Sequence, residues 1–424
     1  MVESGSRSRS PRLLVLSAGP AQLGLLEAAR ARGIWLAVVD RNASALGLRL
    51  ADRRCILSTD DEPAIERLVG ALGIDGLIAP GTDWPIGMAS RIAERAGLPH
   101  PLSSQTAVLV TNKLRQRERL DEAGVPQPRW WVVAPDDPLP AVELPCVVKS
   151  PDRQGQKGLT LVRSAAELSP AIETARRESR GNLALVEELA PGPEVTVIGF
   201  STSGRFRALA VTDRVVADPP AFGVALAHVW PSPSAAEGAA VAERAVEALG
   251  IEHGPSYVQV RVGPAGARVI EVAARLGGGH DAELVERATG VALNDLAIDA
   301  ALGRATEPGP VEPRVGGAVT RFLVAPPGVL VAVDVPEGLA GVERVRIYRE
   351  PGTVIHPLRH GSDRAGALLV VGDSRAEAVD RAERAAAAIA FRVASGDTGA
   401  GTPPPAAGRQ HPGAPASRGS RPDR

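Results

Sequence analysis

A hairpin predicted for residues 257–273 carries the side chains best suited to chemistry in this 424-residue chain. Apolar and polar residues alternate in its first arm, as in a half-buried strand, and Gly and Pro residues supply the turn. When the apolar side chains of both arms share one face, Gln259 lies directly opposite Glu271 on the other face. Two neighbouring oxygen ligands, followed by Arg275, suit a magnesium ion and a phosphoryl group.

The register of this hairpin depends on apolar pairing, in which Val258 faces Val272 and Val260 faces Ile270. A simpler interpretation is an exposed sheet face on which Glu271 pairs only with a neighbouring arginine. The hairpin alone leaves both interpretations open.

The lysines favour the chemical interpretation. The chain has 48 basic residues, and only three of them are lysines, all in one region: Lys113, Lys149 and Lys157. An ammonium is a compact point charge and a guanidinium is a broad planar fork, so a site that fits one against a phosphate oxygen does not freely accept the other. We therefore expect the lysines to serve a phosphate site, although three residues can also cluster by chance.

The loop after Lys149 contains Gly155, Lys157 and Gly158 between two predicted strands. Such a loop can fold down so that backbone amides and an ammonium face a polyphosphate. It is not the P-loop, because the GxxxxGK[ST] pattern is missing.

An acidic segment, VEELAPGPEV, follows a later predicted strand. It places Glu187, Glu188 and Leu189 at the strand end and Glu194 after a Pro-Gly-Pro break. A strand edge that offers a carbonyl and an N–H, with a carboxylate nearby, suits an adenine edge and a ribose diol. Each acid taken singly is also explained as ordinary surface charge.

Composition limits the possible functions. A net charge of −1 gives no basic field to attract nucleic acid. No apolar run approaches the roughly 20 residues of a membrane helix, and the first residues lack a signal-peptide core, so we expect a cytosolic protein with no membrane partner. Cys55 and Cys146 are too few for a disulfide framework and are expected in the core. Residues 1–11 and 397–424 are expected to be disordered tails.

Strands and helices alternate from Arg12 to about residue 96, which predicts a doubly wound parallel sheet of the α/β class. Its first turn reads GPAQLG and departs from the GxGxxG of dinucleotide-binding folds, although Asp40 ends the next strand as a ribose-binding acid would. Asp83 follows the fourth strand, at the edge where such sheets bind ligands. A helix carrying Lys113 then leads to a small antiparallel unit from about residue 130.

The order of these motifs resembles the ATP-grasp superfamily, in its carboxylate–amine ligase and biotin carboxylase-like branch, over most of the chain. The shared features are the helix lysine, the strand-end lysine, the glycine loop, the acidic segment and the magnesium hairpin. The resemblance implies a pre-ATP-grasp domain over residues 12–104, an ATP-grasp domain over 105–310 with a lid at about 130–190, and a small α+β biotin carboxylase-like domain over 311–396.

The resemblance also implies which residues contact ATP. They are the lysines, the loop glycines and the acidic segment: Lys113, Lys149, Gly155, Lys157, Gly158, Glu187, Glu188, Leu189 and Glu194. Within this set, Glu187 and Leu189 would meet the adenine through backbone groups, and Glu194 would meet the ribose.

The same resemblance assigns the binding of magnesium, with manganese as an alternative, to Gln259 and Glu271. Arg275 and Lys157 would act on the transferred phosphoryl group. The family usually has Asn two residues after the second metal ligand, where this chain has Ala273, so a second metal ion is in doubt.

The implied reaction is activation of a carboxylate by ATP to an acyl phosphate, followed by attack of an amine to give an amide, ADP and phosphate. The partners would be a small acid, such as an amino acid or a specialised metabolite, and an amine, and the family suggests a homodimer. Two alternatives stay open: a carboxylase of the biotin carboxylase or purine-synthesis type, and a nucleotide-binding module without catalysis.

A long Pro-punctuated segment, VTDRVVADPPAFGVALAHVWPS, is predicted to line the substrate pocket. Its Arg214 and His228 are substrate-binding candidates, together with Asp83, Gly278 and Gly279. A histidine in this setting is more often packed within a loop than used as a base.

Overall fold

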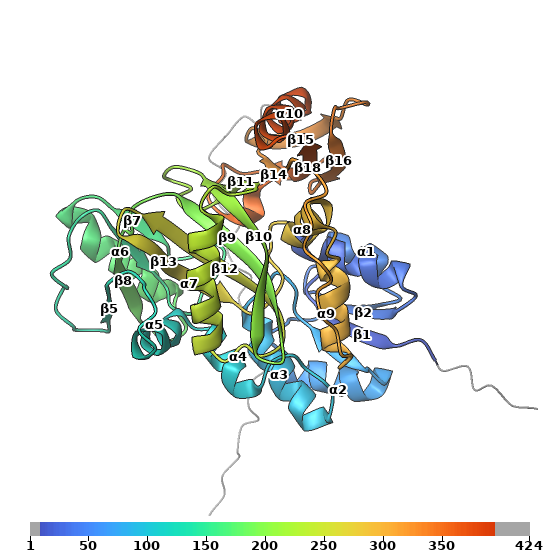
Figure 1. Ribbon diagram of the computed structural model, residues 1–424, viewed down its shortest axis with the longest axis horizontal. Coiled ribbons are helices and arrows are strands. Elements are labelled where there is room, and N and C mark those ends of the chain that lie inside the picture. The colour runs from blue at the N-terminus through green and yellow to red at the C-terminus, as the bar shows by residue number, and fades with distance from the viewer. Residues whose placement is uncertain (1–8, 395–424) are drawn as a thin grey trace, which may run out of the picture.

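The computed structural model describes residues 9–394, which form four β-sheets with helices packed on them (Figure 1). The N-terminal sheet is parallel, with the strand order β3-β2-β1-β4. Its strands are β1 (Arg12–Leu16), β2 (Trp35–Val39), β3 (Arg53–Cys55) and β4 (Gly76–Ile78). Four helices cover its two faces: α1 (Leu23–Ala31) and α9 (Leu293–Ala301) on one, α2 (Glu62–Leu72) and α3 (Trp84–Ala96) on the other. Buried strands between two helical layers confirm the predicted doubly wound sheet.

The helix predicted around Lys113 is in fact two helices, α4 (Ser104–Val110) and α5 (Lys113–Glu122). Asn112 between them has an extended backbone, and its side-chain oxygen accepts hydrogen bonds from Leu114 N at 3.0 Å and Arg115 N at 3.3 Å. This N-cap starts a new helix, so Lys113 lies in the first turn of α5.

A small antiparallel sheet follows, with the order β5-β8-β6-β7 and with α6 (Ala165–Glu178) packed on it. We call this unit the lid sheet. Its strands are β5 (Trp130–Val133), β6 (Cys146–Lys149), β7 (Thr160–Val162) and β8 (Ala184–Glu188). Cys146 in β6 and Cys55 in β3 are buried and free, as predicted.

An eight-stranded sheet forms the centre of the molecule, in the order β13-β12-β9-β10-β11-β14-β18-β16. The strands are β9 (Glu194–Thr202), β10 (Arg205–Val216), β11 (Ala225–Trp230), β12 (Gly254–Gly263), β13 (Gly266–Ala273), β14 (Gly317–Leu323), β16 (Val342–Ile347) and β18 (Gly366–Gly372). Helix α7 (Ala235–Ala248) crosses one face over β9, β10, β12 and β13 (Figure 1). Helix α8 (Asp281–Thr289) packs with α9 between this sheet and the N-terminal sheet.

The strands after residue 311 continue the central sheet, because β11 pairs with β14. Helix α10 (Arg375–Ala388) covers β14 and β18, and a three-stranded sheet lies beside them. That sheet has the order β17-β15-β19, formed by Val354–Ile355, Gly328–Asp334 and Ala390–Ala394. The predicted division of the chain into domains stays a prediction.

Residues 1–8 of the predicted N-terminal tail and the whole predicted C-terminal tail, 397–424, lie outside the described residues 9–394. Residues 9–11 are placed against the N-terminal sheet, where Arg9 Nη2 lies 2.7 Å from Asp75 Oδ1. Within residues 9–394, no helix has the length and hydropathy needed to cross a membrane.

Candidate functional site

Strands β12 and β13 bring the two predicted oxygen ligands together, because Gln259 pairs with Glu271. The predicted pairing of Val260 with Ile270 is wrong. Val260 pairs with Val269, and Ile270 is an extra residue in a β-bulge. Val260 and Val269 are fully buried while Gln259 and Glu271 are partly exposed, so the bulge keeps valines in the core and leaves the ligands accessible.

Helix α5 holds the free edge of β13 in place of another strand. Gln116 Nε2 donates to Val272 O at 2.8 Å, and Val272 N donates to Gln116 Oε1 at 3.0 Å. Arg117 donates to the bulge carbonyls of Val269 at 2.9 Å and Ile270 at 2.6 Å. These bonds pair backbone N–H and C=O groups at the edge of β13 that have no strand partner. Sequence reasoning missed both residues, although their spacing of three and four from the helix lysine was a signal that all three share one helix face.

Lys113 completes this arrangement, because its Nζ lies 2.9 Å from Glu271 Oε1. Burial alone raises the pKa of Glu271, but nearby cations, Lys113 first, outweigh it and bring the pKa to about 2. Burial lowers the pKa of Lys113, and the charges of Glu271 and Asp83 reverse that effect, so the pKa is raised. Both groups are therefore charged at neutral pH, and Glu271 can serve a cation as a carboxylate.

A second buried ion pair involves the strand-end lysine. Lys149 Nζ lies 2.7 Å from Glu187 Oε2, and Arg117 Nε lies 2.7 Å from Glu187 Oε1. Burial raises the pKa of Glu187, but these two cations lower it overall. Burial lowers the pKa of Lys149 to about 8 despite the attraction of Glu187. Arg117 thus links the lid sheet to the bulge of β13.

The acidic segment differs from its prediction in one respect. Glu187 and Glu188 lie in β8, which has β5 on one side and β6 on the other, so the free strand edge expected for adenine begins only at Leu189. The Glu188 carboxylate pairs with Arg129 at 2.9 Å, outside the buried pairs. Glu194 at the start of β9 pairs with Arg214 at 2.6 Å.

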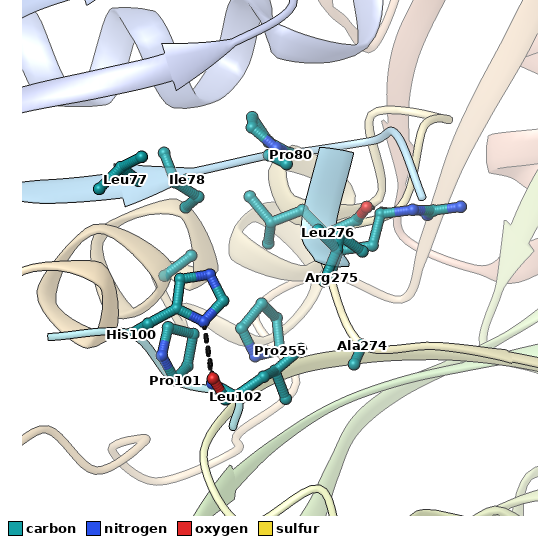
Figure 2. A pocket seen from close by; sticks show the side chains of 13 residues that line it. Leu77, Ile78, Pro80, His100, Pro101, Leu102, Pro255, Ala274, Arg275 and Leu276 are labelled. Carbon is teal, nitrogen blue, oxygen red and sulfur yellow. Dashed lines mark hydrogen bonds between the residues drawn. The ribbon is translucent and has the colours of Figure 1, made fainter. Parts of the chain in front are cut away.

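Arg275 joins the end of β13 to the N-terminal sheet, because its Nε lies 2.6 Å from Asp83 Oδ1. The N–H of Asp83 donates to the side chain of Gln154 in the glycine loop. Three distant parts of the chain therefore meet at Asp83. Arg275 also lines an apolar cavity of about 30 Å³ together with His100 and Leu77, but its guanidinium points away from that cavity (Figure 2).

The glycine loop of residues 151–158 is folded over these groups. Lys113 Nζ donates to Arg153 O at 2.7 Å, and Gln156 contacts Gly223 O and Gly361 N at 3.3 Å each. Gly155 and Gly158 both have φ of 69°, in the left-handed region that favours glycine. A Cβ on Gly158 would also lie 2.2 Å from Ser150 Oγ, so that position needs glycine for space as well. Lys157 is exposed.

The predicted substrate residues lie around the glycine run after Arg275. A Cβ on Gly279 would lie 2.9 Å from His228 Nε2, and one on Gly278 would lie 3.6 Å from Gly81 O. Burial lowers the pKa of His228 to about 4, so its imidazole is neutral at physiological pH. In the first turn of α8, the carboxylate oxygen Asp281 Oδ2 accepts a hydrogen bond from Gly279 N at 3.0 Å.

We call the buried ionic groups the charged cluster: Asp83, Lys113, Arg117, Lys149, Glu187, Glu271 and Arg275. Four cations and three carboxylates leave it one net positive charge. Gln259 borders it through Glu271, whereas Lys157, Glu188 and Glu194 do not join it. Among residues 9–394, no three His, Cys, Asp or Glu side chains are grouped to hold a metal ion by themselves.

Comparison with known proteins gives one family match, to the L-amino acid ligase C-terminal domain 2, over residues 321–394. An uncharacterized protein of Sinorhizobium fredii is 30% identical over 72% of this chain, which spans 65% of that protein. The formate-dependent phosphoribosylglycinamide formyltransferase of Burkholderia thailandensis is 27% identical, over 89% of this chain and 95% of its own length.

Two solved structures have similar folds. The L-amino acid ligase from Bacillus licheniformis superposes with a TM-score of 0.78 at 22% identity, over 91% of this chain and all of its own. The biotin carboxylase domain of the Hydrogenobacter thermophilus 2-oxoglutarate carboxylase, solved with MgADP and bicarbonate, gives 0.75 at 18% identity over 91% of each chain.

Proposed function

We propose that this chain, which is an ATP-grasp protein as its motifs predicted, activates a small carboxylic acid with ATP and joins it to an amine. One observation carries the proposal: an amide and a carboxylate lie side by side on a hairpin, and the carboxylate is 2.9 Å from a buried ammonium beneath a glycine loop. This combination of groups is suited to a metal-bound polyphosphate.

The donor set fits one magnesium ion. Magnesium in phosphate-transfer sites commonly takes one or two protein ligands and completes its shell with water and phosphate oxygens, and Gln259 and Glu271 supply two oxygens. Ala273 is buried and apolar, so it offers no third ligand. When bound, the ion would neutralise charge on the phosphate oxygens. A single ion is therefore our proposal.

The cationic side chains would hold the phosphates. Lys113 and Lys149 end in ammonium groups inside the charged cluster, and Arg275 would contact the transferred phosphoryl group. The net positive charge of the cluster offsets charge that develops during transfer. The glycine loop would exclude water from the acyl phosphate. Exposed Lys157 would reach the phosphates from this loop.

The chemistry then has two displacements. A carboxylate oxygen attacks the terminal phosphorus of ATP and ADP leaves; the amine nitrogen then attacks the acyl carbon, phosphate leaves and the nitrogen loses a proton. Asp83, Arg214, His228, Gly278 and Gly279 are our candidates for lining the acid and amine sites. The ligase family match over residues 321–394 favours an amine as the acceptor over the carboxylation alternative.

Trapping with hydroxylamine tests this function. The protein is incubated with ATP, magnesium and a panel of carboxylic acids, and hydroxamate and ADP are measured. Hydroxamate with at least one acid is expected, because hydroxylamine captures an acyl phosphate whatever the natural amine is. ADP release that requires bicarbonate, or ATP binding without turnover on a broad panel, would contradict the proposal. For the metal-ligand variant Glu271→Gln, Glu62→Gln is the matched control, because Glu62 on α2 is a similarly accessible carboxylate that pairs with Arg91 and Arg95 of α3.

A further inference from the structure

Among residues 9–394, Arg364 differs from the other arginines of the candidate site in having no carboxylate partner. Arg117, Arg214 and Arg275 each contact a carboxylate within 2.7 Å. Arg364, just before β18, contacts no carboxylate within 4.0 Å in residues 9–394. Its Nε donates to Gly361 O at 2.7 Å and its Nη1 to Ala225 O at 3.4 Å, and Nη2 has no acceptor among the described residues.

The surroundings of Arg364 do not compensate for this. Its guanidinium lies 3.7 Å from the centroid of the Phe322 ring, which supports a cation but does not neutralise it. Burial lowers the pKa of Arg364, and the positive charge of Arg214 acts in the same direction. Tyr348, Tyr257 and the Asp281 carboxylate act against them, but the pKa stays lowered. A cation held in this way is best stabilised by an anionic ligand.

Contacts connect Arg364 to both sides of the candidate site. The Phe322 ring meets the His228 ring edge-on at 6.1 Å, and His228 lies against Gly279. On the other side, the carbonyl of Gly361 accepts from Arg364, and the N–H of Gly361 donates to Gln156 Oε1 of the glycine loop. Arg364 therefore lies between the loop and the glycine run, within the segment that matches the ligase C-terminal domain.

We propose that Arg364 binds a carboxylate of the amine substrate that is not consumed in the reaction, so that the enzyme selects amino acids over plain amines. The proposal depends on the ligase function proposed above. A guanidinium whose Nη2 has no acceptor among the described residues can donate to a carboxylate that also matches its charge, whereas a neutral amide in the same place would leave the cation unpaired.

The test compares each amino acid with its own amide, for example L-leucine with L-leucinamide, using an acid that gives hydroxamate. The amino acid is expected to be used roughly 100-fold better in kcat/KM than the amide. Arg364→Met keeps an apolar stem on Phe322 and should remove most of that preference by lowering the value for the amino acid alone. Hydroxamate formation and the melting temperature should stay near those of the unaltered protein.

Several outcomes would overturn the proposal. The first is equal use of amino acid and amide by the unaltered protein, and the second is a preference that survives in Arg364→Met. The third is a loss of hydroxamate formation in Arg364→Met that parallels the loss of amino acid use, which would assign Arg364 to the activated acid. Arg364→Lys keeps the charge and should retain part of the preference, so it provides the test if Arg364→Met does not fold. Absence of hydroxamate with every acid would instead defeat the ligase function itself.

Discussion

The low pKa of Lys149 leads to a quantitative prediction about pH. Burial beside Arg117 and Lys113 brings this pKa from 10.5 to about 8, a shift worth roughly 3 kcal/mol in favour of the neutral amine. Only the protonated ammonium can bind a phosphate oxygen as a cation. About nine tenths of the free enzyme carries it at pH 7 and about one tenth at pH 9.

The kcat/KM for ATP should therefore fall roughly tenfold between pH 7 and pH 9, because this parameter reports groups of the free enzyme. An ammonium with an ordinary pKa would give a flat profile over this range. The measurement is steady-state ADP release at varied ATP with saturating magnesium and acid. Lys149→Arg is the informative variant, since a guanidinium stays protonated throughout. The Lys149→Arg variant should have a lower kcat/KM for ATP than the unaltered protein, and its pH profile should have no inflection near pH 8.

A profile of the unaltered protein that stays flat to pH 9.5 would refute this reasoning. So would an inflection near pH 8 that persists unchanged in Lys149→Arg, because another group would then be titrating.

Three further predictions concern the architecture of the site. Glu271→Gln removes the ionised ligand, so it should lower activity by roughly 100-fold or more and raise the magnesium concentration needed for half-maximal rate. Glu62→Gln should change neither quantity. Equal effects of the two variants would count against the metal site. Gln116→Leu removes both bonds to Val272 and should cost about 2–3 kcal/mol in unfolding free energy, measured by urea denaturation, because the edge of β13 loses its partner; an unchanged midpoint would contradict that role. Gly158→Ala should destabilise the protein more than Gly155→Ala, since both glycines have φ of 69° but only Gly158 also faces Ser150 Oγ. Equal melting temperatures of the two variants would show that the Ser150 side chain moves aside without cost.

Much of the fold follows from local patterns in the sequence. The alternation of strands and helices from Arg12 to about residue 96 predicted the parallel N-terminal sheet, because successive parallel strands need a crossover helix between them. The alternation in β12 predicted that Gln259 faces Glu271, since side-chain direction in a strand has a period of two. The rarity of lysine indicated two members of the charged cluster, Lys113 and Lys149.

Other features depend on contacts between residues that are far apart in the chain. The bulge at Ile270 escaped prediction because its carbonyls are bound by Arg117, 153 residues earlier in the chain. The strand edge expected for adenine at Glu187 is not free, because β8 pairs with β5 on one side and β6 on the other, and unpaired backbone begins only at Leu189.

The sequence by itself therefore determined which side chains could bind a metal and phosphates, and on which elements they lie, because periodicity and turn chemistry act over a few residues. Only the tertiary structure decided which charges are buried against one another. The pKa of Lys149 depends on burial and on the sum of nearby charges. That sum, and the lack of a carboxylate partner for Arg364 within residues 9–394, are fixed only when the lid sheet, the hairpin and the C-terminal strands have packed together.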